Sequence, residues 1–145
     1  MTQINCSALL PFSAHQVYNL VNDIEQYPQF MDGCVGAEIL STSDHIIVAK
    51  LDLAKAGMKY TFTTRNLLQE AESIRLELVE GPFDHFSGCW QFKALSKSAC
   101  KISLEMDFSF SSKLVGLAAL KLFDVVSSNL VDAICKRANQ VLEEG

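Results

Sequence analysis

The chain has 145 residues, of which 49% are hydrophobic and 20% charged, and its formal net charge is −5 at pH 7. This length is typical of one domain whose hydrophobic core needs no disulfide or metal for stability. The acidic balance, with no basic run, lacks the charge pattern of a nucleic-acid-binding protein. We therefore expect a single domain over residues 1–145 and no DNA partner.

The chain begins with a predicted strand and two short helices. Apolar residues alternate along residues 2–10 and predict the strand. A Ser-x-x-Gln capping box that starts at Ser13 predicts a helix over residues 14–22. A second helical turn is expected over residues 24–27. We expect Pro28 to end it, because the residue before a proline disfavours the helical conformation.

Six further strands are predicted in the middle of the chain, with no helix among them. They cover residues 35–42, 45–54, 58–68, 73–80, 86–95 and 99–110. Short turns join them, so neighbouring strands should pair antiparallel. In the later strands apolar and polar residues alternate, which predicts one buried face. The inward positions proposed to contact a ligand are Tyr60, Phe62, Leu76, Trp90, Phe92, Leu104, Met106 and Phe108.

The last predicted element is one long helix over residues 112–143. Apolar residues recur in it at three- and four-residue steps and form a stripe. The stripe consists of Phe123, Val126, Leu130, Ile134, Ala138 and Val141. Between Leu114 and Val126 the helix is apolar almost all round, so this half should be buried on most sides or contact an apolar partner.

This order of elements predicts an α+β fold. A seven-stranded antiparallel sheet has one large apolar face, and the C-terminal helix is the only predicted element long enough to cover it. We expect a curved sheet wrapped around that helix, with a ligand cavity between the two. From the helix, the ligand contacts would be Phe123, Val126 and Leu130. The residues at the entrance would be Tyr27, Pro28, Phe30, Leu117 and Leu120.

Five segments spread over nearly the whole chain carry a family resemblance. They are LPFSAHQVYNLVNDIEQYPQFMDGC, LDLAKAGMKYTFTTRNLL, VEGPFDHFSGCWQFKAL, CKISLEMDFSFSSKL and NLVDAICKRANQV. In this order they resemble the START-like domains of the coenzyme Q-binding, polyketide cyclase/dehydrase family. The bacterial branch of ribosome association toxin proteins is the closer match. The resemblance implies a helix-grip (START-like, Bet v 1-like) fold and a single START-like ligand-binding domain.

The resemblance leaves three functions open. The first is non-catalytic binding of a hydrophobic molecule, ubiquinone or a similar polyprenyl quinone or lipid, held without a covalent bond and supporting respiration. The second is a ribosome association toxin that binds the large (50S) ribosomal subunit and blocks subunit joining. The third is an aromatic or polyketide cyclase. The apolar inward positions favour the first, whereas RNA contact would require local basic residues, for which the candidates are Lys113, Lys121, Lys136 and Arg137.

The remaining motifs favour binding over catalysis. The three histidines lie on separate predicted elements, and no GxSxG, P-loop or GxGxxG pattern occurs, so we expect no catalytic residue. The five cysteines have irregular spacings without a CxxC, which predicts reduced thiols and no metal site. The first residues lack a basic start, and no apolar run reaches about 20 residues. We therefore expect a cytoplasmic protein, with transient contact at the inner membrane if its ligand is a lipid.

Overall fold

Seven strands form one antiparallel sheet in the order β1-β7-β6-β5-β4-β3-β2. The computed structural model describes residues 2–55, 57–81, 83–110 and 123–142. The strands are β1 (Thr2–Leu10), β2 (Cys34–Thr42), β3 (Ile46–Lys55), β4 (Met58–Gln69), β5 (Ser73–Glu80), β6 (Phe83–Ser96) and β7 (Ala99–Phe110). All seven predicted strands are present, and the largest difference is that β6 begins at Phe83 rather than at residue 86.

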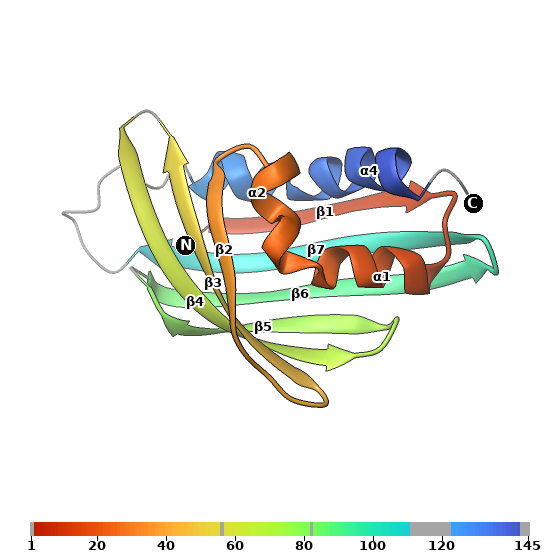
Figure 1. Cartoon of the computed structure of the whole chain (residues 1–145), viewed down its shortest axis with the longest axis horizontal. Coiled ribbons are helices and arrows are strands. Elements are labelled where there is room, and N and C mark those ends of the chain that lie inside the picture. Colours follow the sequence, from red (N-terminus) through yellow and green to blue (C-terminus); the bar gives the residue numbers. More distant parts are fainter. Residues whose placement is uncertain (1, 56, 82, 111–122, 143–145) are drawn as a thin grey trace.

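The helices cover one face of this sheet (Figure 1). They are α1 (Ala14–Asn22), the 3-10 helix η1 (Ile24–Gln26), α2 (Tyr27–Phe30) and α4 (Leu130–Val141). The sheet twists strongly, so β2, β3 and β4 cross β6 and β7 at a steep angle (Figure 1). Helix α4 contacts β1 and β7, α1 contacts β6 and β7, and α2 contacts β2. This arrangement confirms the predicted helix-grip fold.

The start of α1 follows directly from the sequence. The Ser13 hydroxyl oxygen accepts a hydrogen bond from the Gln16 backbone N–H at 3.1 Å. In return, the Gln16 side-chain oxygen accepts one from the Ser13 backbone N–H at 3.0 Å. This is the reciprocal capping box that the Ser-x-x-Gln pattern predicts.

The prediction that Pro28 ends a helical turn is wrong. The chain continues as α2 to Phe30, and Pro28 lies in the first turn of that helix. A proline there sacrifices no hydrogen bond, since the first N–H groups of a helix have no intrahelical partner. Tyr27, the residue before the proline, adopts helical φ and ψ values of −52° and −41°.

The C-terminal helix is not the single continuous element that we predicted. Residues 123–128 are helical, a turn follows at Asn129, and α4 begins at Leu130. The Ser127 hydroxyl donates to the Phe123 carbonyl at 2.7 Å, a contact that tends to bend helices. Residues 112–122 and Glu143, which the prediction also included, lie outside the described residues.

The predicted apolar stripe is buried over most of its length despite this interruption. Phe123 and Val126 are buried before the turn, as the stripe predicted. After it the buried residues are Val131, Ile134 and Ala138, while Leu130 is half-buried. The stripe prediction is wrong at Val141, which is 44% exposed. The buried face of α4 is thus the predicted one at Ile134 and Ala138 and differs from it at the two ends of the helix. Within the described residues, no helix combines the length and apolar character that crossing a bilayer requires.

Candidate functional site

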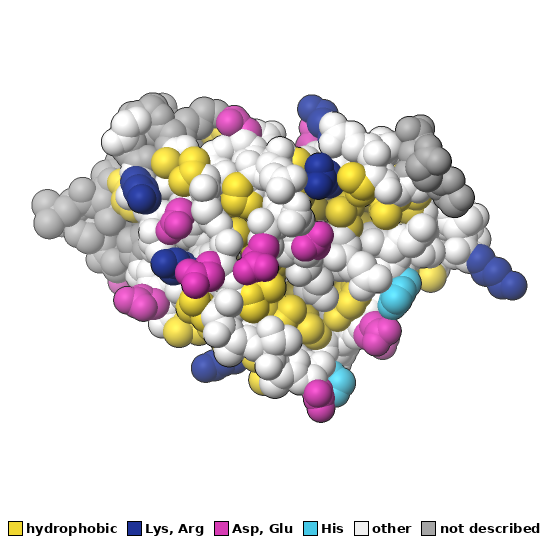
Figure 2. Space-filling view, in the orientation of Figure 1, with side chains coloured by type: hydrophobic (Ala, Val, Ile, Leu, Met, Phe, Trp, Pro, Cys, Tyr) yellow, Lys and Arg dark blue, Asp and Glu magenta, His cyan; other side chains and the backbone are white. Residues whose placement is uncertain are grey.

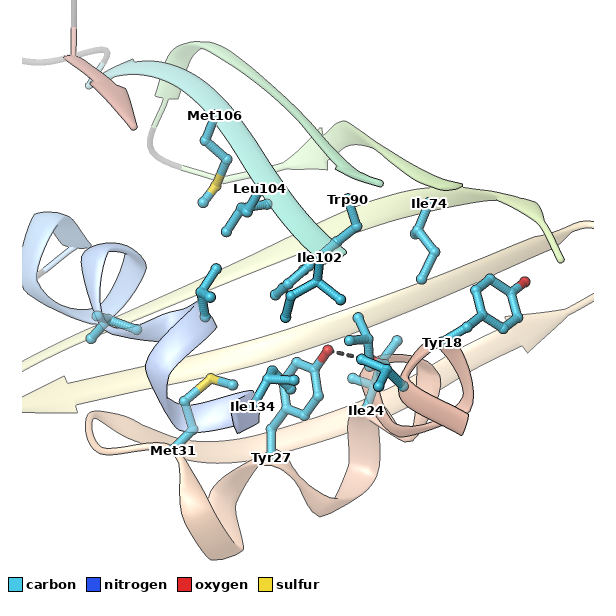
Figure 3. Close-up of a cluster of buried hydrophobic side chains, with 14 of the residues drawn as sticks. Tyr18, Ile24, Tyr27, Met31, Ile74, Trp90, Ile102, Leu104, Met106 and Ile134 are labelled. Atoms are coloured by element: carbon cyan, nitrogen blue, oxygen red, sulfur yellow. Dashed lines mark hydrogen bonds between the residues drawn. The ribbon is translucent and has the colours of Figure 1, made fainter. Parts of the chain in front are cut away.

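A cavity of about 70 Å³ lies between the sheet and the helices. Side chains from η1 and from the residue after α2 point across the interior toward side chains of β5, β6 and β7, as Ile24, Met31 and Trp90 show in Figure 3. A pocket that buries a drug-sized ligand usually measures roughly 300–1,000 Å³. In this form, the cavity therefore has room only for a small molecule, and a long-tailed quinone would require the walls to move apart.

Seven of the eleven predicted ligand-contacting residues line this cavity. They are Phe62, Leu76, Trp90, Met106, Phe123, Val126 and Leu130. They come from four strands and from both sides of the turn at Asn129. Strand alternation and helix periodicity thus bring together most of the predicted wall.

The other four predicted contacts do not line the cavity. Phe92 stacks on Trp90 at a centroid distance of 6.3 Å and meets the Tyr18 ring edge-on at 5.5 Å, so it packs beneath α1. Leu104 and Phe108 are fully buried core residues. Tyr60 is partly buried and packs against the core rather than along the cavity wall.

The predicted entrance residues have different positions. Tyr27 is buried and lines the cavity, and its hydroxyl donates a hydrogen bond to the Val21 carbonyl, drawn as a dashed line in Figure 3. Phe30 meets the Tyr27 ring edge-on at 5.8 Å and carries the Arg137 guanidinium over its face at 5.2 Å. Pro28 is half-buried and does not line the cavity. Leu117 and Leu120 lie outside the described residues.

Close contact between the loop after α2 and residues 123–128 closes one side of the cavity. Gly33 has a φ of +91°, and a Cβ atom there would lie 2.6 Å from Val126 Cγ2. Only glycine therefore allows the loop to pack this closely on the helix. Two neighbours of this contact, Met31 and Cys34, also line the cavity.

The prediction missed the polar part of the wall. Four polar side chains line the cavity: Asn22, Thr64, Asn66 and Ser127. The last three are buried. The alternation that places Tyr60 and Phe62 inward continues to Thr64 and Asn66, so a signal for two of them was present in the sequence. Polar residues usually lie on the wet face of such a sheet, so their type argued against an inward position.

The hydrogen bonds of these polar groups are only partly satisfied. The Thr64 hydroxyl donates to the Asn66 side-chain oxygen at 2.8 Å, and the Ser127 hydroxyl donates to the Phe123 carbonyl at 2.7 Å. The Asn22 side-chain oxygen is buried and has no hydrogen-bond partner among the described residues. A buried polar atom without a partner is uncommon in native proteins and indicates that a ligand or water can supply one.

Apolar residues of α1, η1 and β3 also line the cavity, and the prediction missed these too. They are Val21, Ile24, Ala49, Leu51 and Leu53. The sequence predicted that the early helices and strands exist, but it contained no signal that the twist of the sheet folds them over β5 and β6.

The titratable groups of the wall are held in their neutral forms. Burial raises the pKa of the Cys34 thiol to about 11. Burial also raises the pKa of the Tyr27 phenol. Among the described residues of the wall, no side chain is an Asp, Glu, Lys, Arg or His. This arrangement can bind an apolar molecule and satisfy a few hydrogen bonds, but it offers no poised base or nucleophile.

A protein family matches most of the chain. The profile of the polyketide cyclase/dehydrase and lipid transport family matches residues 10–135. Ribosome association toxin RatA of Vibrio cholerae is 46% identical over 144 residues, covering 99% of this chain and 100% of the relative. A mitochondrial coenzyme Q-binding protein homologue of Xenopus laevis is 26% identical over 139 residues, covering 93% of this chain and 57% of the relative.

Among solved structures, an aromatase/cyclase from a Streptomyces species has the same fold. The two superpose with a TM-score of 0.82 at 21% identity, covering 97% of this chain and 95% of the other. At this level of identity the likeness concerns the fold alone.

Proposed function

This chain belongs to the polyketide cyclase/dehydrase and lipid transport family, and from that premise we propose that it associates with the ribosome. The observation that carries the proposal is the 46% identity, over the full length, to a protein named for ribosome association. The resemblance of the sequence to the ribosome association toxin branch points to the large subunit as the partner. By contrast, the 21% identity to an aromatase/cyclase supports no cyclase activity.

An acidic protein must meet ribosomal RNA through a local basic surface. On the face seen in Figure 2, carboxylates gather over β2, β3 and β4, which makes that region a poor candidate. One end of the outer face of β6 and β7 differs: Lys93 lies directly opposite Lys101 across the two strands, and both are exposed, whereas Glu105 and Asp107 lie farther along the same face of β7. Like charges in register destabilise a sheet, so this pair favours a role in contacting an anionic partner. We propose it as the RNA-facing surface.

Co-sedimentation with separated bacterial ribosomal subunits tests this proposal. We expect the protein to sediment with the large subunit and to be released as salt rises. Lys101→Glu should weaken binding and lower the salt slope by about 1, and it should fold, since the new carboxylate faces Lys93. The matched control is Lys59→Glu, because Lys59 is exposed on β4 and lies opposite Ala54, so the reversal breaks no ion pair among the described residues. Failure to sediment with either subunit would reject ribosome association.

The sequence suggested four basic residues for RNA contact, and two of them, Lys136 and Arg137, lie on α4. Lys136 is exposed, whereas the Arg137 guanidinium lies over the Phe30 ring. Lys113 and Lys121 lie outside the described residues. Lys136→Glu in the same assay separates the two surfaces: a larger loss of binding than that of Lys101→Glu would move the interface from β6 and β7 to α4.

A second function is supported by the cavity itself. We propose that it binds an apolar ligand without reacting with it, and the coenzyme Q-binding relative supports a quinone-like molecule. The supporting observation is a largely apolar wall with buried polar groups that have hydrogen-bonding capacity to spare. Ubiquinones with short tails should quench Trp90, which lines the cavity.

A ligand series with growing alkyl tails tests this second function. Each methylene buried should contribute about 0.8 kcal/mol until the cavity can expand no further. Isothermal titration calorimetry measures the trend. The matched control variant is Leu95→Ala, because Leu95 is 52% exposed and lies outside the cavity. Absence of binding throughout the series would reject the second function and leave ribosome association untouched.

A further inference from the structure

Gly88 interrupts the row of large inward side chains on β6. It is buried and lies between Phe86 and Trp90 in that row, and both of these residues line the cavity. A glycine inside a strand weakens it, because glycine has more backbone freedom to lose and no side chain to pack. The reason for a glycine at this position must therefore lie in its surroundings.

Neither the backbone conformation nor the strand pairing requires a glycine here. Gly88 is not among the glycines with a positive φ, so other residues can adopt its conformation. It pairs with Leu76 of β5 and with Met106 of β7, and the register around both pairs is continuous, without a bulge. Close approach of another group is a common reason for a glycine inside a strand.

Two flexible side chains extend over Gly88. A Cβ atom there would lie 2.9 Å from Met106 Cγ and 3.2 Å from Leu76 Cδ1, so these side chains occupy the space that a side chain at position 88 would fill. Both line the cavity, whereas Gly88 does not, because they cover it. Methionine is unbranched and adapts readily to a changed neighbour. The space over Gly88 is therefore filled by side chains that can turn aside.

We infer that the ring of a ligand lies over Gly88, and that this glycine makes the cavity selective for molecules with a rigid, planar head. When Leu76 and Met106 turn aside, a ring can lie against the Gly88 backbone with Phe86 and Trp90 on either side. Aromatic neighbours pack favourably on a ring, either offset or edge to face. This inference rests on the second proposed function, since it specifies the head group of the ligand in the same cavity.

The movement of these two side chains also accounts for the size of the cavity. About 70 Å³ is room for a few water molecules, each needing about 10–15 Å³, and is too small for a substituted ring. The space that Leu76 and Met106 vacate adds to this volume without any displacement of the backbone. A ligand with a planar head can thus enter while the sheet keeps its register.

Gly88→Ala tests the position of the ring. The added methyl group would occupy the space over residue 88, which a flexible chain can avoid by bending and a rigid ring cannot. The probes are 4-propylphenol and 1-nonanol, which each have nine carbon atoms and one hydroxyl group and differ in the ring. Isothermal titration calorimetry measures their affinities for the full chain. Gly88→Ala should lower the affinity for 4-propylphenol about tenfold and that for 1-nonanol less than about twofold.

The matched control is Ser87→Ala, at the neighbouring position of β6. Ser87 is exposed and lies on the opposite face of the strand, so its loss should change neither affinity. The thermal midpoint of each variant shows whether it folds.

A second variant opens the same space instead of filling it. Leu76→Ala removes one of the two side chains that extend over Gly88, and Leu76 is only half-buried, so this variant should fold. Space left by a truncated apolar side chain can bind a small aromatic molecule. Leu76→Ala should raise the ratio of the affinity for 4-propylphenol to that for 1-nonanol about twofold or more. This ratio decides the question if Gly88→Ala does not fold.

The outcomes separate this inference from the function on which it rests. If Gly88→Ala changes both affinities equally, or neither, and Leu76→Ala leaves their ratio unchanged, the ring does not lie over Gly88. The glycine then serves only the packing of Leu76 and Met106, and the cavity remains a binding site. If neither compound binds, and the longer-tailed series does not bind either, the second proposed function fails together with this inference.

Discussion

Two groups of buried side chains meet in the interior and differ in how completely their interactions are satisfied. The aromatic cluster consists of Phe62, Phe83, Phe86, Phe108 and Phe123, whose rings contact one another at centroid distances of 4.6–6.2 Å, mostly edge to face. The polar lining consists of Asn22, Thr64, Asn66 and Ser127. In the first group, ring contacts fill the space. In the second, an acceptor stays without a partner among the described residues.

This difference suggests that the aromatic cluster mainly stabilises the fold and that the polar lining mainly serves ligand binding. Edge-to-face ring contacts contribute energy beyond the area that they bury, so the aromatic cluster should account for much of the stability. The polar lining contributes little to stability, because an unpaired buried acceptor opposes folding. Such a group is retained at a functional site when a ligand benefits from it. Substitutions in the two groups should therefore have effects of opposite sign.

The largest effect is expected in the aromatic cluster. Phe108 is fully buried and lies 4.6 Å from the Phe123 ring. Phe108→Ala should lower the free energy of unfolding by about 3–5 kcal/mol, through lost burial and a residual cavity. Denaturant unfolding measures the loss, and Leu9→Ala, at a side chain that is 70% exposed, should change stability by less than about 0.5 kcal/mol. A loss below about 1 kcal/mol for Phe108→Ala would show that the aromatic cluster contributes little to the stability of the fold.

A smaller effect of opposite sign is expected in the polar lining. Asn22→Leu removes the unpaired buried oxygen and should raise the free energy of unfolding by about 1 kcal/mol. The matched control is Asn139→Leu, because Asn139 is exposed on α4 and should give no such gain. If Asn22→Leu is clearly destabilising in the ligand-free protein, its oxygen is already satisfied there, and the contrast between the two groups disappears.

The smallest effect is a change with pH at Cys34, which borders the polar lining. Burial raises the pKa of its thiol to about 11, above the value of about 8.5 in an unfolded chain. Between these pH values the unfolded chain releases the proton first, so the free energy of unfolding should fall as pH rises. Unfolding at pH 8 and pH 10.5, compared with Cys34→Ala, isolates this contribution. An identical pH dependence in the variant would show that Cys34 is not desolvated.

The sequence correctly predicted the elements whose signals are local. The capping box at Ser13 specifies the start of α1 within four residues, and a two-residue alternation assigns the inward face of β5, β6 and β7. It was wrong where two local rules compete. Pro28 can end a helical turn or begin the next helix, and the periodicity around Asn129 looks continuous although the helix is interrupted there.

The sequence by itself determined the order of the elements, the inward faces of the later strands and the family, because these depend on spacings along the chain. Only the tertiary structure decided which inward residues share a cavity. Asn22, Asn66 and Ser127 come from α1, β4 and the helical residues 123–128, and the strong twist of the sheet brings them to one wall. Strand alternation determines which face of the sheet a residue lies on. It does not determine which helix that residue packs against. The polar character of the cavity therefore arises from packing between distant segments, which no local pattern contains.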